Sequence, residues 1–116
     1  MTTLEDKQVF FAGCVARFVF DLKTKGILVT FGEAFRSPET CSLYAKEGKG
    51  ITASLHQLRL AVDLNFWQND KLVSTTEEIA NLWENYSTGI FQCCAGFHFT
   101  TRRDSDHFSV SHNGIR

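Results

Sequence analysis

Apolar residues repeat at helical spacing near the start of the chain, which predicts a helix over residues 2–25. Thr2 and Glu5 have the spacing of a capping box at its start, and Gly26 is a typical helix end. The residues of its apolar stripe are Leu4, Phe11, Val15, Phe18 and Leu22.

Two further helices are predicted from their capping residues. Ser37 followed by Pro38 begins one that runs to about Lys46. Thr75 with Glu78 begins the other, and its apolar stripe contains Ile79, Leu82, Trp83 and Tyr86. Residues 48–56 are polar and contain glycine, so a loop is expected there.

Apolar and polar residues alternate strictly from Leu58 to Trp67, which predicts a strand with Arg59, Asp63 and Trp67 on the polar face. Shorter strands are expected over residues 27–31, 71–73 and 107–110, whereas residues 87–106 have no firm period. The order of these elements predicts an α+β fold, with helices packed on a small antiparallel sheet.

Composition limits the organisation to one compact domain over residues 1–116, without a separate second domain. The chain has 116 residues, 43% of them apolar, with eleven Phe, two Trp and two Tyr to form one core. The net charge is -1, which leaves no basic surplus for a phosphate backbone. Nucleic acid and stable membrane association are therefore excluded as expected partners, and a monomer is expected.

The four cysteines form no CxxC pair, which favours reduced thiols in a cytoplasm. Residues 11–14 read Phe-Ala-Gly-Cys, like a lipoprotein cleavage site, but a mixed charge pattern and a short apolar run precede them. No signal peptide is expected. Whether Cys93 and Cys94 react outside a reducing compartment stays open.

Two histidines and a carboxylate form a candidate metal set. His56 and Asp63 are seven residues apart, and His107 lies near the C-terminus with Asp104 before it. Two imidazoles and one carboxylate are a sufficient protein ligand set for catalytic Zn²⁺, because three ligands leave a fourth position for water.

The sequence around these residues resembles a known family. Residues 54–63 read Ser-Leu-His-Gln-Leu-Arg-Leu-Ala-Val-Asp, similar to the Ser-x-His-x-x-Gly-x-Ala-x-Asp motif of zinc peptidases that cut D-amino-acid bonds in peptidoglycan. Asp104 and His107 resemble its second motif. Residues 32–39, 58–65 and 107–114 look like blocks of the phage-encoded branch of this family. The family includes D-Ala-D-Ala carboxypeptidases, VanX-type dipeptidases and phage L-alanyl-D-glutamate endolysins.

This resemblance implies a Hedgehog/DD-peptidase-like fold and assigns roles to particular residues. Zn²⁺ ligation is implied for His56, Asp63 and His107, and Asp104 is implied as the catalytic acid/base. Arg36 matches an arginine that binds substrate or stabilises the transition state, although a surface salt bridge is an equal alternative.

Ser54 is expected to support the first ligand with a hydrogen bond. His98 and His112 are interpreted as structural.

Two residues depart from the family pattern. Arg59 occupies the glycine position of the first motif, where it is expected to contact substrate or pair with an acid. Asp106 stands where other branches often have tryptophan, and it could serve as the base in place of Asp104 or help to hold a second cation.

The expected function is that of a phage or prophage endolysin. It would hydrolyse the peptide stem of peptidoglycan at the L-alanyl-D-glutamate bond, and remain in the host cytoplasm until released to the cell wall. Two alternatives stay open. One is a D-Ala-D-Ala carboxypeptidase or dipeptidase, and the other is a degenerate, non-catalytic zinc domain that binds wall fragments or belongs to a virion.

Overall fold

The computed structural model describes residues 3–47, 54–101 and 103–116. It contains three α-helices, one short 3₁₀ helix and five strands. The helices are α1 (Leu4–Thr24), α2 (Pro38–Lys46), α3 (Glu77–Glu84) and η1 (Gly96–His98). The strands are β1 (Leu28–Phe31), β2 (Ala61–Gln68), β3 (Lys71–Val73), β4 (Cys93–Ala95) and β5 (His107–Val110).

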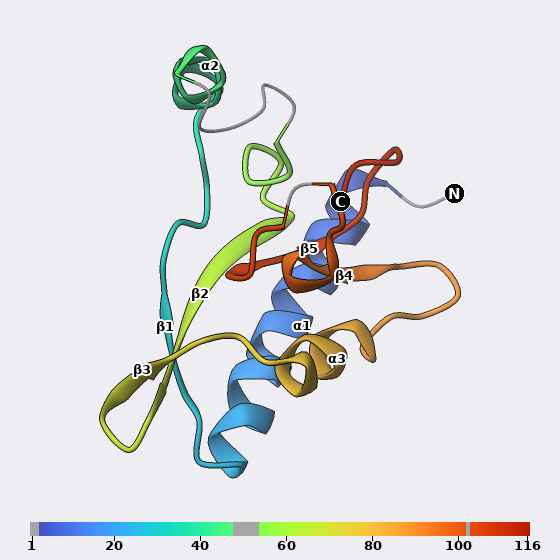
Figure 1. The fold of residues 1–116 in the computed structure, drawn as a ribbon. Coiled ribbons are helices and arrows are strands. Elements are labelled where there is room, and N and C mark those ends of the chain that lie inside the picture. Colours follow the sequence, from blue (N-terminus) through green and yellow to red (C-terminus); the bar gives the residue numbers. More distant parts are fainter. Residues whose placement is uncertain (1–2, 48–53, 102) are drawn as a thin grey trace.

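The strands form one antiparallel sheet in the order β1-β2-β5-β4, and β3 pairs with the C-terminal end of β2. Helix α1 packs against β1 and β5, and α3 packs against α1 and β4. Helix α2 lies beyond the end of β1, away from the other two helices (Figure 1). The α+β architecture expected from the sequence is confirmed.

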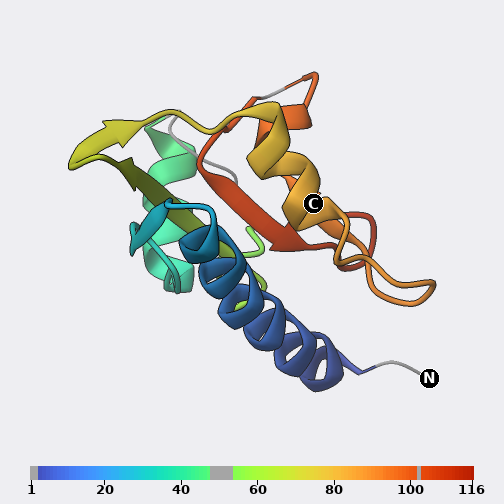
Figure 2. The same ribbon diagram turned by 90° about the horizontal axis from the view of Figure 1, so that it is seen from below.

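The core lies between α1, α3 and one face of the sheet, as the view from below shows (Figure 2). Phe18 lies at its centre. The centroid of the Phe18 ring is 5.3 Å from that of Trp83 and 5.2 Å from that of Phe108. Trp83 is fully buried and its Nε1 donates a hydrogen bond to the Ser109 carbonyl at 3.1 Å. Each fully buried large apolar side chain contributes roughly 1.5–3 kcal/mol, so this aromatic cluster fixes α1 and α3 on the sheet.

Two of the three predicted helix caps are wrong by one residue. Helix α1 is capped by Thr3, whose Oγ1 accepts from the Asp6 amide while the Asp6 carboxylate accepts from the Thr3 amide, both at 3.1 Å. Thr2 lies outside the described residues. Thr76 rather than Thr75 caps α3, because the Thr75 side chain is buried. The second helix, by contrast, begins as predicted, with Ser37 as its cap.

The long strand begins three residues later than predicted. Residues 55–59 form a tight turn, in which the Leu58 amide donates to the Leu55 carbonyl at 3.1 Å. Arg59 closes this turn with φ at 58°, so the alternation of a strand does not set its side-chain direction. From Ala61 onward the prediction holds, and Asp63 points away from the face that packs on the helices. Of the loop predicted over residues 48–56, residues 48–53 lie outside the described residues.

The stretch without a firm period contains β4 and η1. All three residues of β4 are buried, so no apolar and polar alternation marks this strand. Two of them are Cys93 and Cys94, and Cys14 of α1 is also buried. Within the described residues, no helix is long and apolar enough to cross a bilayer.

We expect the thiols of Cys93 and Cys94 to be unreactive in the folded protein. Hydrogen bonding with Cys14 and burial raise the pKa of Cys93, and burial raises the pKa of Cys94 to about 11. Alkylation followed by peptide mass spectrometry should give rates at least ~100-fold below those in urea, because the thiolate is the reactive form. Equal rates in folded and unfolded protein would contradict this burial.

Candidate metal centre

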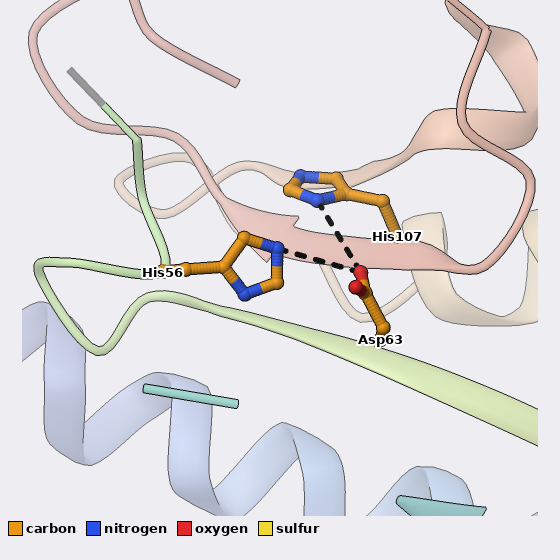
Figure 3. A group of neighbouring side chains, drawn as sticks. All are labelled: His56, Asp63 and His107. Carbon is orange, nitrogen blue, oxygen red and sulfur yellow. Dashed lines mark ion pairs between the residues drawn. The ribbon is translucent and has the colours of Figure 1, made fainter. Parts of the chain in front are cut away.

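Three side chains from separate segments meet on the sheet face opposite the helices. Asp63 on β2 and His107 on β5 are direct partners in the antiparallel register, so their side chains share a face. His56 comes from the turn before β2. Figure 3 shows both imidazole rings directed at the Asp63 carboxylate.

The distances suit a single ion. His56 Nε2 lies 3.4 Å from Asp63 Oδ1, and His107 Nδ1 lies 4.0 Å from the same oxygen. One ligand atom from each residue lies within 4.8 Å of the others. Ligand atoms bound to one tetrahedral Zn²⁺ at about 2.0–2.2 Å lie about 3.3–3.6 Å apart. The distance between His56 and Asp63 already fits this geometry, and the other ligand atoms would move closer together on binding.

The donor atoms themselves favour a cation. Asp63 Oδ1 and His107 Nε2 are buried and have no hydrogen-bond partner within the part of the chain that the structure describes. An unsatisfied buried polar atom costs about 1–3 kcal/mol, and a bound metal would remove this penalty at Asp63. His56 Nδ1 donates to the Ala34 carbonyl at 2.9 Å, which leaves Nε2 as the ligand atom. This chemistry fits a metal such as Zn²⁺.

The two histidines differ in their proton affinity. Burial lowers the pKa of His107 to about 4, and the charges of His56 and Arg36 act in the same direction. Burial also opposes protonation of His56, but the neighbouring Asp63 carboxylate and the hydrogen bond with the Ala34 carbonyl outweigh this and raise its pKa. His107 would therefore be neutral at pH 7 and able to bind a metal, and His56 would be the group at which protons compete with a metal.

A thermal-shift series would test this competition. At free zinc 100-fold above its dissociation constant, binding should stabilise the fold by about 2.7 kcal/mol. Because ligation needs neutral imidazole, the increase in Tm should be large at pH 7.5 and decline as the pH falls through the raised pKa of His56. An increase that is the same at pH 5.5, or absent at both pH values, would contradict the assignment.

Arg36 is held beside the centre by its backbone and its side chain. Its amide donates to the His56 carbonyl at 3.3 Å, and its guanidinium pairs with the Glu33 carboxylate. The Arg36 side chain is only 13% exposed, and its charge opposes protonation of both histidines, although the pKa of His56 is raised overall. The structure thus shows the salt bridge expected as one alternative for Arg36 and places its positive charge near the two histidines, while its role toward a substrate or transition state stays a prediction.

The expected supporting residue and the two aspartates also lie near the ligands. Ser54 is buried, and its Oγ accepts from the His56 amide at 3.2 Å. Asp104 is exposed in the turn before β5, and its carbonyl accepts from the His107 amide at 3.0 Å. Asp106 is exposed overall, but partial burial of its carboxyl together with the charge of Asp63 raises the pKa of this group.

The remaining histidines lie apart from the metal set. His98 Nδ1 pairs with Glu84 at 2.8 Å, and His112 Nδ1 lies 2.9 Å from Lys7 Nζ. These contacts agree with the structural interpretation of both residues.

Two glycines that the sequence analysis did not single out shape the site. Gly32 donates to the Asp63 carbonyl at 2.7 Å, and a Cβ at this position would lie 3.2 Å from that oxygen. A Cβ at Gly96 would lie 2.0 Å from the Asp104 carbonyl oxygen and 3.0 Å from His107 Cβ. The only sequence signal was a glycine just after an apolar stretch, which by itself does not reveal which backbone lies opposite.

Comparison with solved structures relates this fold to a peptidase. The crystal structure of Serratia marcescens L-Ala D-Glu endopeptidase ChiX superimposes with a TM-score of 0.56 at 16% sequence identity, covering 73% of this chain and 68% of that chain. The fold is shared. No protein-family model matches the sequence, and no curated protein matches it.

Proposed function

We propose that this chain is a zinc-dependent peptidase that hydrolyses the peptide stem of peptidoglycan at the L-alanyl-D-glutamate bond. One observation carries the proposal: ligand atoms of His56, Asp63 and His107 lie within 4.8 Å of one another on a fold similar to that of an L-Ala D-Glu endopeptidase. A fold alone can support many functions, and it is the chemistry of this site that favours a peptidase.

Zn²⁺ is the proposed metal because two imidazole nitrogens and one carboxylate oxygen are a typical catalytic ligand set for it. His56, Asp63 and His107 would hold it. When bound, the metal supplies a Lewis acid that polarises a carbonyl group and increases the acidity of water.

Asp104 is the proposed general base and acid. Its exposed carboxylate would accept a proton from the attacking water and return it to the nitrogen of the leaving amine. The backbone hydrogen bond from His107 to the Asp104 carbonyl ties this residue to a metal ligand. Arg36 would stabilise the negative charge that develops on the carbonyl oxygen, since its charge already acts on both histidines.

The biological role that follows is that of a phage or prophage endolysin. A monomer made in the host cytoplasm would reach the peptide stems only after release through the inner membrane. Expression with and without an added export leader tests this role. Only the exported protein should lyse cells, and export of the Asp104→Asn variant should leave them intact.

A synthetic stem peptide tests the bond. The substrate is L-alanyl-γ-D-glutamyl-diaminopimelyl-D-alanyl-D-alanine, and the products are identified by liquid chromatography and mass spectrometry. Free L-alanine and a peptide with N-terminal D-glutamate, formed with zinc and not with chelator, are expected. Release of D-alanine would identify a carboxypeptidase or dipeptidase instead, and no product from zinc-loaded protein would favour a non-catalytic binding domain.

A further inference from the structure

Arg59 has a backbone conformation that its residue type does not favour. Four non-glycine residues have positive φ among those described, and three of them are Asn or Asp, which tolerate this region: Asn69, Asp70 and Asn113. Arg59, with φ at 58°, is the exception. Arg59 therefore occupies a position that suits glycine better. A functional role of its side chain would compensate for the backbone strain.

The backbone places Arg59 at the metal centre. Its amide donates to the His56 carbonyl at 3.3 Å, and the amide of Arg36 donates to the same oxygen, also at 3.3 Å. Two arginines are thus attached to the backbone of one proposed metal ligand. Arg36 is paired with Glu33, whereas Arg59 forms no ion pair within the described part of the chain.

The guanidinium of Arg59 stacks on an aromatic ring, and its N–H groups can still bind a ligand. Its Cζ lies 4.1 Å from the centre of the Phe35 ring, and both residues are exposed. Stacking on an aromatic face occupies the flat side of the guanidinium and leaves its N–H groups free in the plane. These groups match the geometry of a carboxylate, which an arginine can bind through two parallel hydrogen bonds.

We infer that Arg59 binds a carboxylate of the substrate and selects stem peptides in which D-glutamate keeps its free α-carboxylate. This inference rests on the proposed function. Because D-glutamate is linked through its γ-carboxyl group, its α-carboxylate belongs to the residue directly after the bond to be cut. It is the negative charge nearest to the reacting carbonyl on that side, and Arg59 is the exposed cation attached to the backbone of His56.

The test compares two stem peptides that differ at one group, the free α-carboxylate and its carboxamide. Wild-type protein should cleave the acid with a kcat/KM about 10- to 100-fold higher. Arg59→Gly should cleave both peptides equally, through a loss of activity on the acid alone. Arg59→Lys, which keeps the charge but not the planar fork, should retain part of the preference.

Thermal unfolding separates this role from a structural one. Glycine adopts positive φ without strain, so the Tm of Arg59→Gly should equal or exceed that of wild type. A Tm lower by more than about 4 °C, together with loss of activity on both peptides, would make Arg59 structural and overturn the inference. An unchanged preference for the acid in Arg59→Gly would also overturn it.

A binding experiment distinguishes failure of this inference from failure of the proposed function. Calorimetric titration of the two peptides into zinc-loaded Asp104→Asn, with and without Arg59→Gly, measures recognition without turnover. Tighter binding of the acid that depends on Arg59, with no cleavage by wild type, would retain the inference and reject the peptidase. Cleavage of both peptides without preference, and equal binding, would do the reverse.

Discussion

Replacement of Asp104 by asparagine is expected to reduce kcat by about 100- to 10,000-fold, the usual contribution of a general acid–base group. The amide has the shape of the carboxylate but cannot accept the proton from water. The hydrogen bonds that join Asp104 to His107 and Gly96 are formed by its backbone and are kept in the variant, so we expect the fold and the metal content to stay unchanged. Cleavage assays and metal analysis of the same preparation give both numbers.

Two matched variants control this experiment. Asp63→Asn should lose both activity and metal, since it removes the charge that both histidines face. Asp106→Asn should keep most of the activity, although partial burial and the charge of Asp63 raise the pKa of Asp106. An active Asp104→Asn beside an inactive Asp106→Asn that still binds metal would transfer the acid–base role to Asp106.

The second large effect is expected from Gly96→Ala. The added Cβ would lie 2.0 Å from the Asp104 carbonyl oxygen and 2.9 Å from its carbonyl carbon, and this backbone cannot move aside as a flexible side chain would. Overpacking of this kind costs about 1–3 kcal/mol or more. Because His107 Cβ is also only 3.0 Å away, the displacement should reach the metal ligand. Thermal unfolding and zinc titration should both show a loss.

Gly13→Ala is the matched control for this substitution. Gly13 is exposed within α1, and a Cβ there would meet nothing within 4 Å. Alanine in a helix interior is more favourable than glycine by about 1 kcal/mol, so this variant should be more stable and bind zinc normally. Gly96→Ala with the stability and zinc affinity of wild type would show that the turn before β5 does not depend on this close approach.

Local signals account for the parts of the fold that the sequence predicted correctly. The alternation after Ala61 and the Ser37 cap each depend on a few neighbouring residues, and both occur in the structure. The errors arose where burial overrode local pattern. Leu58 continues the strand alternation but lies in a turn, because the first two residues of this turn, Leu55 and His56, are buried. Strand β4 is buried on both faces and so leaves no period.

In the candidate site, too, local sequence predicted some features, whereas others depend on how distant segments pack. Motif spacing selected His56, Asp63 and His107, but it carries no information on the β2–β5 register that pairs Asp63 with His107. It also could not reveal that Glu33 pairs with Arg36, or that Gly96 lies against Asp104, because these contacts depend on how distant segments pack. The positive φ of Arg59 agrees with the glycine of the similar motif and gives that departure a physical meaning.

Mass spectrometry of purified peptidoglycan after digestion shows whether the protein cleaves the L-alanyl-D-glutamate bond in a zinc-dependent way. Zinc-loaded wild-type protein, chelated protein and Asp104→Asn are compared on the same material. We expect new L-alanine C-termini and D-glutamate N-termini with the first sample and intact stems with the other two. Intact stems with zinc-loaded wild-type protein, or the same cleavage with chelated protein, would contradict the proposed zinc peptidase.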